Sequence, residues 1–208
     1  MIEIILIIIL AAIFIIFLRK LPEVKVNSDL RSQISVNAPG PLIITHKPIS
    51  AEKIGKLWKR ADFAFERGNF TKAERFYLKI ATSDPQNPKI YGRLGIIYLE
   101  QKNFLDAKEA FGEAIKKDSK NALWYNNLGL ALYNLKRFSE SIEAYKKSVA
   151  LDSGKAIRFF NLGLVYEAIG EYQNALSAYE RAAALEPENI EFQSLISRIK
   201  DELEKSKK

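Results

Sequence analysis

The strongest constraint on the fold of this 208-residue chain is a pattern that recurs every 34 residues between Ile54 and Asn189. Four positions show it most clearly, and each is filled four times. Two hold small residues and two hold aromatic residues: Ala61, Gly95, Gly129 and Gly163; Ala73, Ala107, Ser141 and Ala175; Phe70, Phe104, Phe138 and Tyr172; Tyr77, Phe111, Tyr145 and Tyr179. Small residues suit places where two helices cross closely, and aromatic residues fill the core beside them. A period of this length indicates helix–turn–helix units that bury their apolar faces by stacking.

Each repeat predicts two helices, because turn residues and prolines interrupt the pattern twice per period. The expected repeats span residues 54–87, 88–121, 122–155 and 156–189, and Ser50 is a suitable N-cap for the first helix. The expected helices cover residues 51–66 and 71–83, 89–101 and 105–117, 122–135 and 139–151, and 156–169 and 173–185.

A ninth helix is expected over residues 190–205, within a last segment that spans residues 190–208. Its apolar residues fall on one face at helical spacing, and they are Phe192, Leu195, Ile196, Ile199 and Leu203. A helix of this kind closes the exposed end of a stack of repeats. Residues 205–208, Lys-Ser-Lys-Lys, are expected to form a frayed tail.

The recurring small and aromatic positions resemble those of the tetratricopeptide repeat family. The resemblance implies an all-α fold, an α-solenoid of four helix–turn–helix repeats ending in the capping helix. It also implies that the first helices of the repeats line a concave groove that binds a protein or peptide segment. It does not identify that partner, because such repeats bind many unrelated partners.

The family's groove positions supply the candidate peptide contacts. They are Lys59, Lys89, Arg93, Asn126, Asn127, Leu130, Tyr133, Phe160, Asn161 and Leu164. Asn127 and Asn161 share one repeat position, and a primary amide can both donate to and accept from one peptide unit. Two interpretations of these amides stay open: they hold an extended peptide by its backbone, or they cap or bridge neighbouring helices.

Cations at one end of the groove predict a basic cluster of Lys59, Lys89 and Arg93, able to meet a carboxylate or an acidic segment. Some relatives clamp a chaperone's carboxyl terminus with two lysines, two asparagines and an arginine. The corresponding positions here hold Trp58, Asp62, Arg93, Leu123 and Asn127, so no such clamp is expected. Trp124, beside a packing position, is expected to be half exposed.

An apolar run precedes the repeats: from Ile2 to Leu18 every residue except Glu3 is apolar. This length is at the short end of what spans the hydrocarbon core of a bilayer. An uncleaved membrane anchor over residues 1–20, a cleaved signal peptide and a buried helix are the three interpretations. The anchor is favoured, because no cation begins the run and no small-residue cleavage site ends it. Cations lie on its carboxyl side, which predicts a single-pass membrane protein with its amino terminus outside and its repeats in the cytoplasm.

Residues 21–50 are expected to form a flexible juxtamembrane linker, because Pro22, Pro41 and Pro48 interrupt regular structure. Within it, residues 42–45 form the apolar run Leu-Ile-Ile-Thr. Three interpretations stay open for this run. It packs on the open face of the first repeat, it is simply exposed, or it occupies a groove.

Composition argues against several function classes. Cysteine is absent, and the single histidine, His46, lies in the linker, so the repeats can assemble no disulfide, histidine triad or histidine metal site. A glycine-rich phosphate loop is also missing. We therefore expect no enzyme and no cofactor. The net charge of +7 is mild and unclustered, which argues against nucleic acid as a partner.

Together these features predict a membrane-anchored adaptor that binds a peptide or protein segment in the concave groove and helps to assemble a membrane or envelope complex. Two alternatives stay open. One is an organelle-surface recruitment or import receptor, although cations in the groove count against a basic targeting peptide. The other is a structural protein whose repeats associate with one another and need no peptide ligand.

Overall fold

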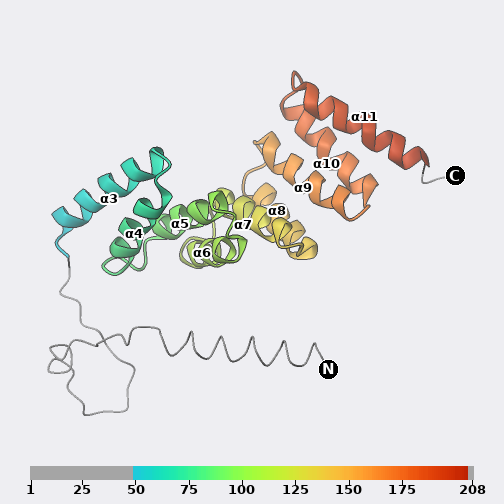
Figure 1. Ribbon diagram of the computed structural model, residues 1–208. Coiled ribbons are helices and arrows are strands. Elements are labelled where there is room, and N and C mark those ends of the chain that lie inside the picture. Colours follow the sequence, from blue (N-terminus) through green and yellow to red (C-terminus); the bar gives the residue numbers. More distant parts are fainter. Residues whose placement is uncertain (1–48, 206–208) are drawn as a thin grey trace, which may run out of the picture. The chain divides into compact units, whose positions relative to one another are not determined.

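The computed structural model describes residues 49–205, and its regular structure in this range is entirely α-helical (Figure 1). The helices are α3 (Ala51–Glu66), α4 (Phe70–Ala81), α5 (Pro88–Glu100), α6 (Phe104–Lys117), α7 (Ala122–Asn134), α8 (Phe138–Leu151), α9 (Ala156–Ala168), α10 (Tyr172–Leu185) and α11 (Ile190–Lys205). Within this range no helix has the length and apolar character needed to cross a bilayer. The expected anchor, the apolar run at residues 42–45 and residues 206–208 of the tail all lie outside the described residues.

The helices match the expected ranges to within two residues, and the predicted all-α solenoid with a capping helix is confirmed. The second helix of each repeat begins one residue earlier than expected, at the recurring aromatic residue. In the first two repeats a preceding asparagine explains this start, because Asn69 and Asn103 accept hydrogen bonds from the backbone N–H groups of Lys72 and Asp106. Ser50 precedes α3, but its side chain makes no capping hydrogen bond.

A left-handed residue closes the turn between the two helices of every repeat. Gly68, Lys102, Lys136 and Gly170 lie 34 residues apart, with φ of 70°, 58°, 61° and 76°. This conformation turns the chain so that the next backbone N–H donates back into the ending helix, as Asn103 does to the Tyr98 carbonyl at 2.8 Å. Glycine adopts it without strain, whereas the two lysines do not.

Lys102→Gly and Lys136→Gly should therefore each raise the free energy of unfolding by about 0.5–1 kcal/mol. The substitution removes the left-handed strain of a Cβ-bearing residue, and glycine's larger backbone entropy offsets part of that gain. Urea unfolding followed by circular dichroism measures the change. Lys147→Gly, in the middle of the regular helix α8, is the matched control and should lose about 1 kcal/mol. Equal losses in all three variants would contradict the strain argument.

Inside each repeat, a small residue of the first helix lies against an aromatic ring of the second. A Cβ added at Gly95, Gly129 or Gly163 would stand only 2.7, 2.8 or 2.5 Å from the nearest ring atom. The rings are those of Phe111, Tyr145 and Tyr179, all almost fully buried. The recurring small and aromatic positions of the sequence therefore correspond to one type of contact, which occurs once in each repeat and joins α5 to α6, α7 to α8 and α9 to α10.

Between repeats, each second helix packs on the first helix of the next repeat, and α5 contacts α7 as α7 contacts α9. Trp124 fills one such junction, since a Cβ at Gly92 would stand 2.6 Å from its Nε1 atom. The expectation that Trp124 is half exposed is wrong, because only 6% of its surface is accessible. At the carboxyl end α11 packs on α10 and buries Phe192 and Ile199.

Candidate functional site

Two adjoining hollows lie along α5 and α7, two of the first helices that the family resemblance assigns to the groove. One has a volume of about 690 Å³ and is lined by residues that include Trp58, Asp62, Lys89, Arg93, Ile96 and Leu123. The other, about 430 Å³, is lined by residues that include Ile96, Leu99, Leu123, Asn127, Leu130 and Asn134. Because Ile96 and Leu123 line both, the hollows form one continuous surface, which we call the α5–α7 groove.

Exposed leucines mark the middle of the α5–α7 groove. Leu123 is 50% exposed and Leu130 is 37% exposed, although both are large apolar residues in well-formed helices. Ile157, which shares a repeat position with Leu123, is 52% exposed on α9. Apolar groups gathered in this way are typical of surfaces that a partner covers. Leu130 is one of the candidate peptide contacts predicted from the sequence, and the family resemblance also places Leu123 and Ile157 on the groove, at the repeat position of Lys89.

The cations of the groove are arranged differently from the expected cluster. The Nε atom of Arg93 lies 3.8 Å from Oδ1 of Asp62, and its guanidinium stands 4.9 Å from the centre of the Phe65 ring. Lys89 forms no ion pair with any carboxylate in residues 49–205. Lys59 does not line this groove but a different hollow, between α3 and α4. The three cations therefore do not line one hollow, and Lys89 is the cation of the α5–α7 groove that forms no ion pair within residues 49–205.

Asp62 also serves the core, because the Tyr77 hydroxyl donates to its Oδ1 at 2.6 Å. Burial, and next the hydrogen bond to Asp62, raise the pKa of Tyr77 far above its usual value. The last repeat has a similar bond to a carboxylate at a different repeat position: the Tyr179 hydroxyl donates to Glu167 at 2.7 Å, and Arg198 of α11 pairs with the same carboxylate at 2.9 Å. These carboxylates therefore join helices, Asp62 linking α3 to α4 and Glu167 linking α9 to α10 and α11.

The asparagines form a short chain of amides. Asn161 of α9 donates through Nδ2 to Oδ1 of Asn126 at 3.0 Å, and Asn126 donates to Oδ1 of Asn127 at 3.3 Å. Asn126 is buried, so its predicted place on the open groove is not observed. The Asn127 amide nitrogen at one end of the chain has no partner among the described residues. Asn161 thus bridges two repeats, and Asn127 keeps two N–H donors for a ligand.

Three of the residues predicted to contact a peptide, Tyr133, Phe160 and Leu164, instead pack mainly against other residues of the protein. The Phe160 ring lies 5.7 Å from that of Phe192 in α11, and Leu164 packs in the same region against the Tyr179 and Ile199 cluster. The centre of the Tyr133 ring lies 5.8 Å from the centre of the Phe138 ring. All three are half-buried. The capping helix therefore covers part of the surface that the resemblance assigned to the groove in the last repeat.

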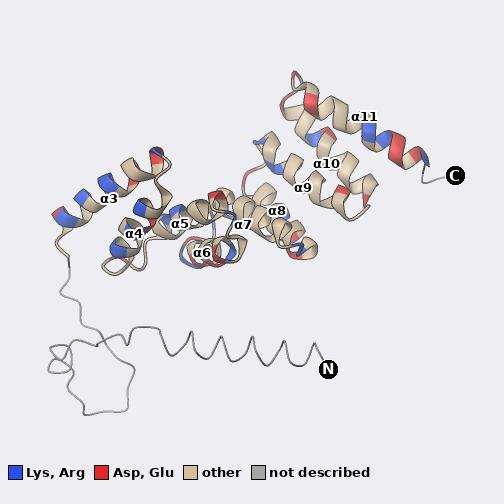
Figure 2. Ribbon diagram, viewed as in Figure 1, with Lys and Arg blue, Asp and Glu red and all other residues tan. Residues whose placement is uncertain are grey.

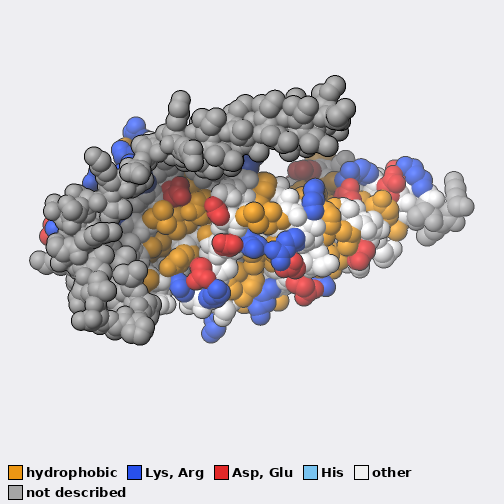
Figure 3. Space-filling view, turned by 60° about the horizontal axis from the view of Figure 1, so that its bottom comes forward, with side chains coloured by type: hydrophobic (Ala, Val, Ile, Leu, Met, Phe, Trp, Pro, Cys, Tyr) orange, Lys and Arg blue, Asp and Glu red, His pale blue; other side chains and the backbone are white. Residues whose placement is uncertain are grey.

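No group of His, Cys, Asp and Glu in the described part of the chain is arranged to hold a metal ion. On the face shown in Figure 3, side chains of both charges are intermixed with hydrophobic ones. Such a mixture lacks the continuous positive charge that would attract the phosphate backbone of a nucleic acid.

Comparison with protein families shows that the tetratricopeptide repeat family matches residues 93–156 and again residues 156–189. Comparison with curated proteins finds no match. Among solved structures, the chain is similar to MamA, with 28% identity, a TM-score of 0.70, and 73% of this chain and 83% of that chain covered. MamA from Desulfovibrio magneticus RS-1 is 18% identical, with a TM-score of 0.71 and coverage of 75% and 88%. YrrB, described as a TPR protein with an unusual peptide-binding site, is 19% identical, with a TM-score of 0.63 and coverage of 69% and 74%. Tetratricopeptide repeats are thus recognised in this chain by the comparison with protein families and by the comparison with solved structures.

Proposed function

We propose that this protein is a membrane-anchored adaptor that binds an extended peptide or protein segment in the α5–α7 groove. The observation that carries the proposal is the junction of the two hollows. There Leu123 and Leu130 are exposed, and the same two hollows are lined by the Asn127 amide and the Lys89 ammonium, neither of which donates to another side chain within residues 49–205. An extended segment would place apolar side chains on the leucines, its backbone carbonyls at Asn127 and an acidic residue near Lys89.

Likeness of fold supports a protein-interaction role. YrrB shares the fold and is described as having a peptide-binding site. Because its sequence is only 19% identical, the comparison itself supports a shared fold and no more. The organelle import alternative is disfavoured, because a basic targeting peptide would meet Lys89 and Arg93 in the groove. A self-associating structural protein is the remaining alternative, and the test below separates it.

The anchor and the location complete the proposal. The apolar run at residues 2–18 would hold the protein in a membrane, with the repeats on the cytoplasmic side. Tethering would raise the effective concentration of the repeats near other membrane components. That arrangement suits the assembly of a membrane or envelope complex.

Partner binding should be lost when the groove is changed and kept when an equally exposed site elsewhere is changed. Leu123→Ser/Lys89→Glu alters the groove, and Leu105→Ser/Lys120→Glu is the control. Leu105 is 57% exposed on α6 and, like Lys120, lines neither hollow of the groove. With proximity labelling by the full-length protein in cells, we expect the groove variant to label its partners about tenfold less. This corresponds to a loss of about 1.4 kcal/mol in the free energy of partner binding when the partner does not saturate the groove.

Equal loss in both variants, or in neither, would refute the groove as the binding surface. If only further copies of this chain are labelled, and equally in all variants, self-association without a peptide ligand is the better account. Thermal unfolding of each variant checks that the fold is intact before labelling is compared.

A further inference from the structure

Within residues 49–205, the first repeat has a face that no neighbouring helix covers, which we call the open face; in the later repeats the preceding second helix covers it. Ile97, Ala131 and Val165 share one repeat position, and each is fully buried in a cluster with the second helix of the preceding repeat. Phe63 occupies this position in α3. No described helix precedes α3, and Phe63 is 57% exposed.

Most of the open face has been made polar. Where the second repeat buries Ile90 and Leu94, the first repeat has Lys56 and Arg60 at the corresponding positions. Charged residues at a terminal repeat keep the end of a solenoid soluble. Solubility alone, however, leaves the exposed Phe63 unexplained.

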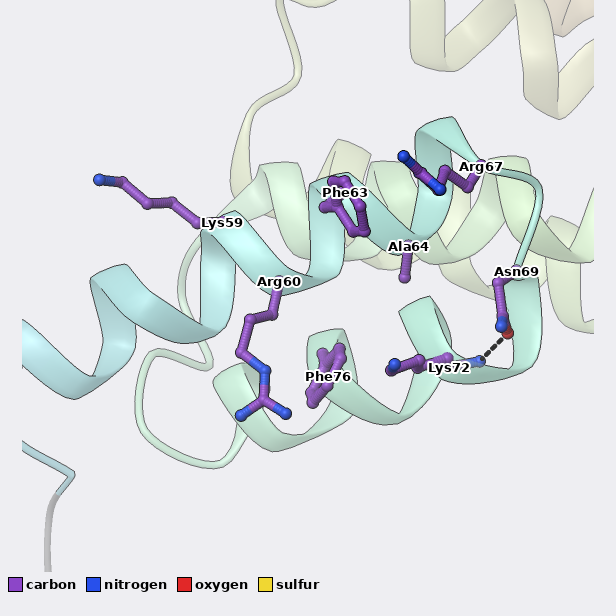
Figure 4. A pocket seen from close by; sticks show the side chains of 8 residues that line it. All are labelled: Lys59, Arg60, Phe63, Ala64, Arg67, Asn69, Lys72 and Phe76. Atoms are coloured by element: carbon purple, nitrogen blue, oxygen red, sulfur yellow. Dashed lines mark hydrogen bonds between the residues drawn. The ribbon is translucent and has the colours of Figure 1, made fainter.

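A hollow of about 610 Å³ lies between α3 and α4 on this face (Figure 4). Phe63 enters it from α3 and Phe76 from α4. Phe76 stands where the later repeats have only alanine, at residues 110, 144 and 178. The guanidinium of Arg67 lies 4.5 Å from the centre of the Phe63 ring, and that of Arg60 lies 4.7 Å from the centre of the Phe76 ring. The hollow is therefore aromatic inside and cationic at its edge.

The charge of this hollow has one sign. Its lining includes the cations Lys59, Arg60, Arg67 and Lys72 and no carboxylate. None of these four cations forms an ion pair with a carboxylate in residues 49–205. Blue segments of the ribbon, which mark Lys and Arg, recur along α3 in Figure 2. Arginines held against aromatic rings keep their N–H groups free for carboxylates, since the ring contacts use only the face of the guanidinium.

We propose that the open face of α3 and α4 binds an acidic amphipathic helix of a partner protein, in the place where a preceding second helix would lie. The junction between α4 and α5 shows the packing that such a helix would reproduce, with Tyr77 and Ile80 buried against the Ile97 cluster. An apolar stripe on the helix would cover Phe63 and Phe76. Glutamates or aspartates beside the stripe would meet Arg60 and Arg67 as charge-assisted pairs.

Two synthetic helical peptides test this proposal. Both carry leucines at i, i+3 and i+7, flanked by glutamate in one peptide and by lysine in the other. Binding to the full-length protein in a neutral detergent is followed by fluorescence anisotropy. We expect the glutamate peptide to bind and the lysine peptide not to bind. Arg60→Glu/Arg67→Glu should weaken the glutamate peptide at least tenfold, whereas the control Lys120→Glu/Lys147→Glu should leave its affinity unchanged.

Equal binding of the two peptides, or unchanged binding to the Arg60→Glu/Arg67→Glu protein, would overturn the proposal. Failure of the glutamate peptide to bind, with arginine-dependent binding to vesicles of anionic lipid, would identify a lipid surface instead. The groove variant Leu123→Ser should bind the glutamate peptide as well as the unchanged protein. Loss of binding in that variant would place the peptide in the α5–α7 groove and refute the open-face site without refuting the groove.

Discussion

Replacing Gly163 with alanine should lower the free energy of unfolding by about 3 kcal/mol, although alanine is the better helix former. The new Cβ would stand 2.5 Å from Cε1 of Tyr179, a separation that real Cβ atoms do not show. The Tyr179 ring cannot easily withdraw, because it is fully buried and its hydroxyl donates to Glu167 at 2.7 Å. Overpacking of this kind costs more than helix propensity returns. Urea unfolding of the full-length protein measures the change.

Gly112→Ala is the matched control, with the same chemical change in a helix of the same solenoid. Nothing lies within 4 Å of a Cβ added at Gly112, so this variant should gain about 1 kcal/mol from helix propensity. Opposite signs at the two positions would establish close approach as the cause. Tyr179→Leu should also recover part of the loss in the Gly163→Ala protein. A stable Gly163→Ala protein would show that α9 and α10 separate without cost.

That contact between a small residue and a ring is why the fold could be predicted so far from the sequence. The contact lies within one repeat, so its two halves recur at fixed spacing and fix both helices of the pair. Gly129 and Tyr145, for example, are 16 residues apart and meet directly. Local contacts of this kind were sufficient to predict each helix to within two residues.

The candidate site was less predictable, because it depends on neighbours that the repeat pattern does not encode. Phe160 and Leu164 hold groove positions, but the capping helix takes the place of a fifth repeat and packs against them. Asn161 bonds to Asn126 rather than to its repeat equivalent, a pairing set by how α7 and α9 approach. Phe63 is indistinguishable in the pattern from buried residues, and it is exposed because no helix within residues 49–205 packs on α3 in the way that α4 packs on α5.

Above pH 10, the free energy of unfolding of this protein should fall steeply with rising pH, because several of its tyrosines are buried in the folded state. Tyr77, Tyr145 and Tyr179 share one repeat position and are almost fully buried. Burial raises the pKa of all three well above the ordinary value of 10, and hydrogen bonds to Asp62 and Glu167 raise it further for Tyr77 and Tyr179. Tyr98 is raised to a pKa of about 12, first by burial and then by its hydrogen bond to Glu74.

The direction follows from which state loses its proton first. A tyrosine in the unfolded chain ionises near pH 10, whereas the folded chain holds the neutral form to higher pH. The stabilisation is therefore complete below pH 10 and is lost as the pH rises toward the folded pKa. Each tyrosine removes about 1.4 kcal/mol per pH unit in that window, so the three almost fully buried tyrosines together remove about 4 kcal/mol per unit, and Tyr98 adds to this loss. Urea unfolding at pH 8, 10 and 11 measures this slope.

Tyr145→Phe isolates one tyrosine, because the Tyr145 hydroxyl makes no hydrogen bond with any residue in the described range. At pH 8 both proteins carry a neutral ring, so their stabilities should agree to within about 1 kcal/mol. At pH 11 the variant should have gained about 1.4 kcal/mol relative to the unchanged protein, because its unfolded state has no phenol to ionise. Lysines and carboxylates are the same in both proteins, so their titration cancels in the difference. A difference in stability that does not change between pH 8 and pH 11 would mean that the Tyr145 phenol ionises equally easily in the folded chain, and hence that water reaches the helix pair of the third repeat.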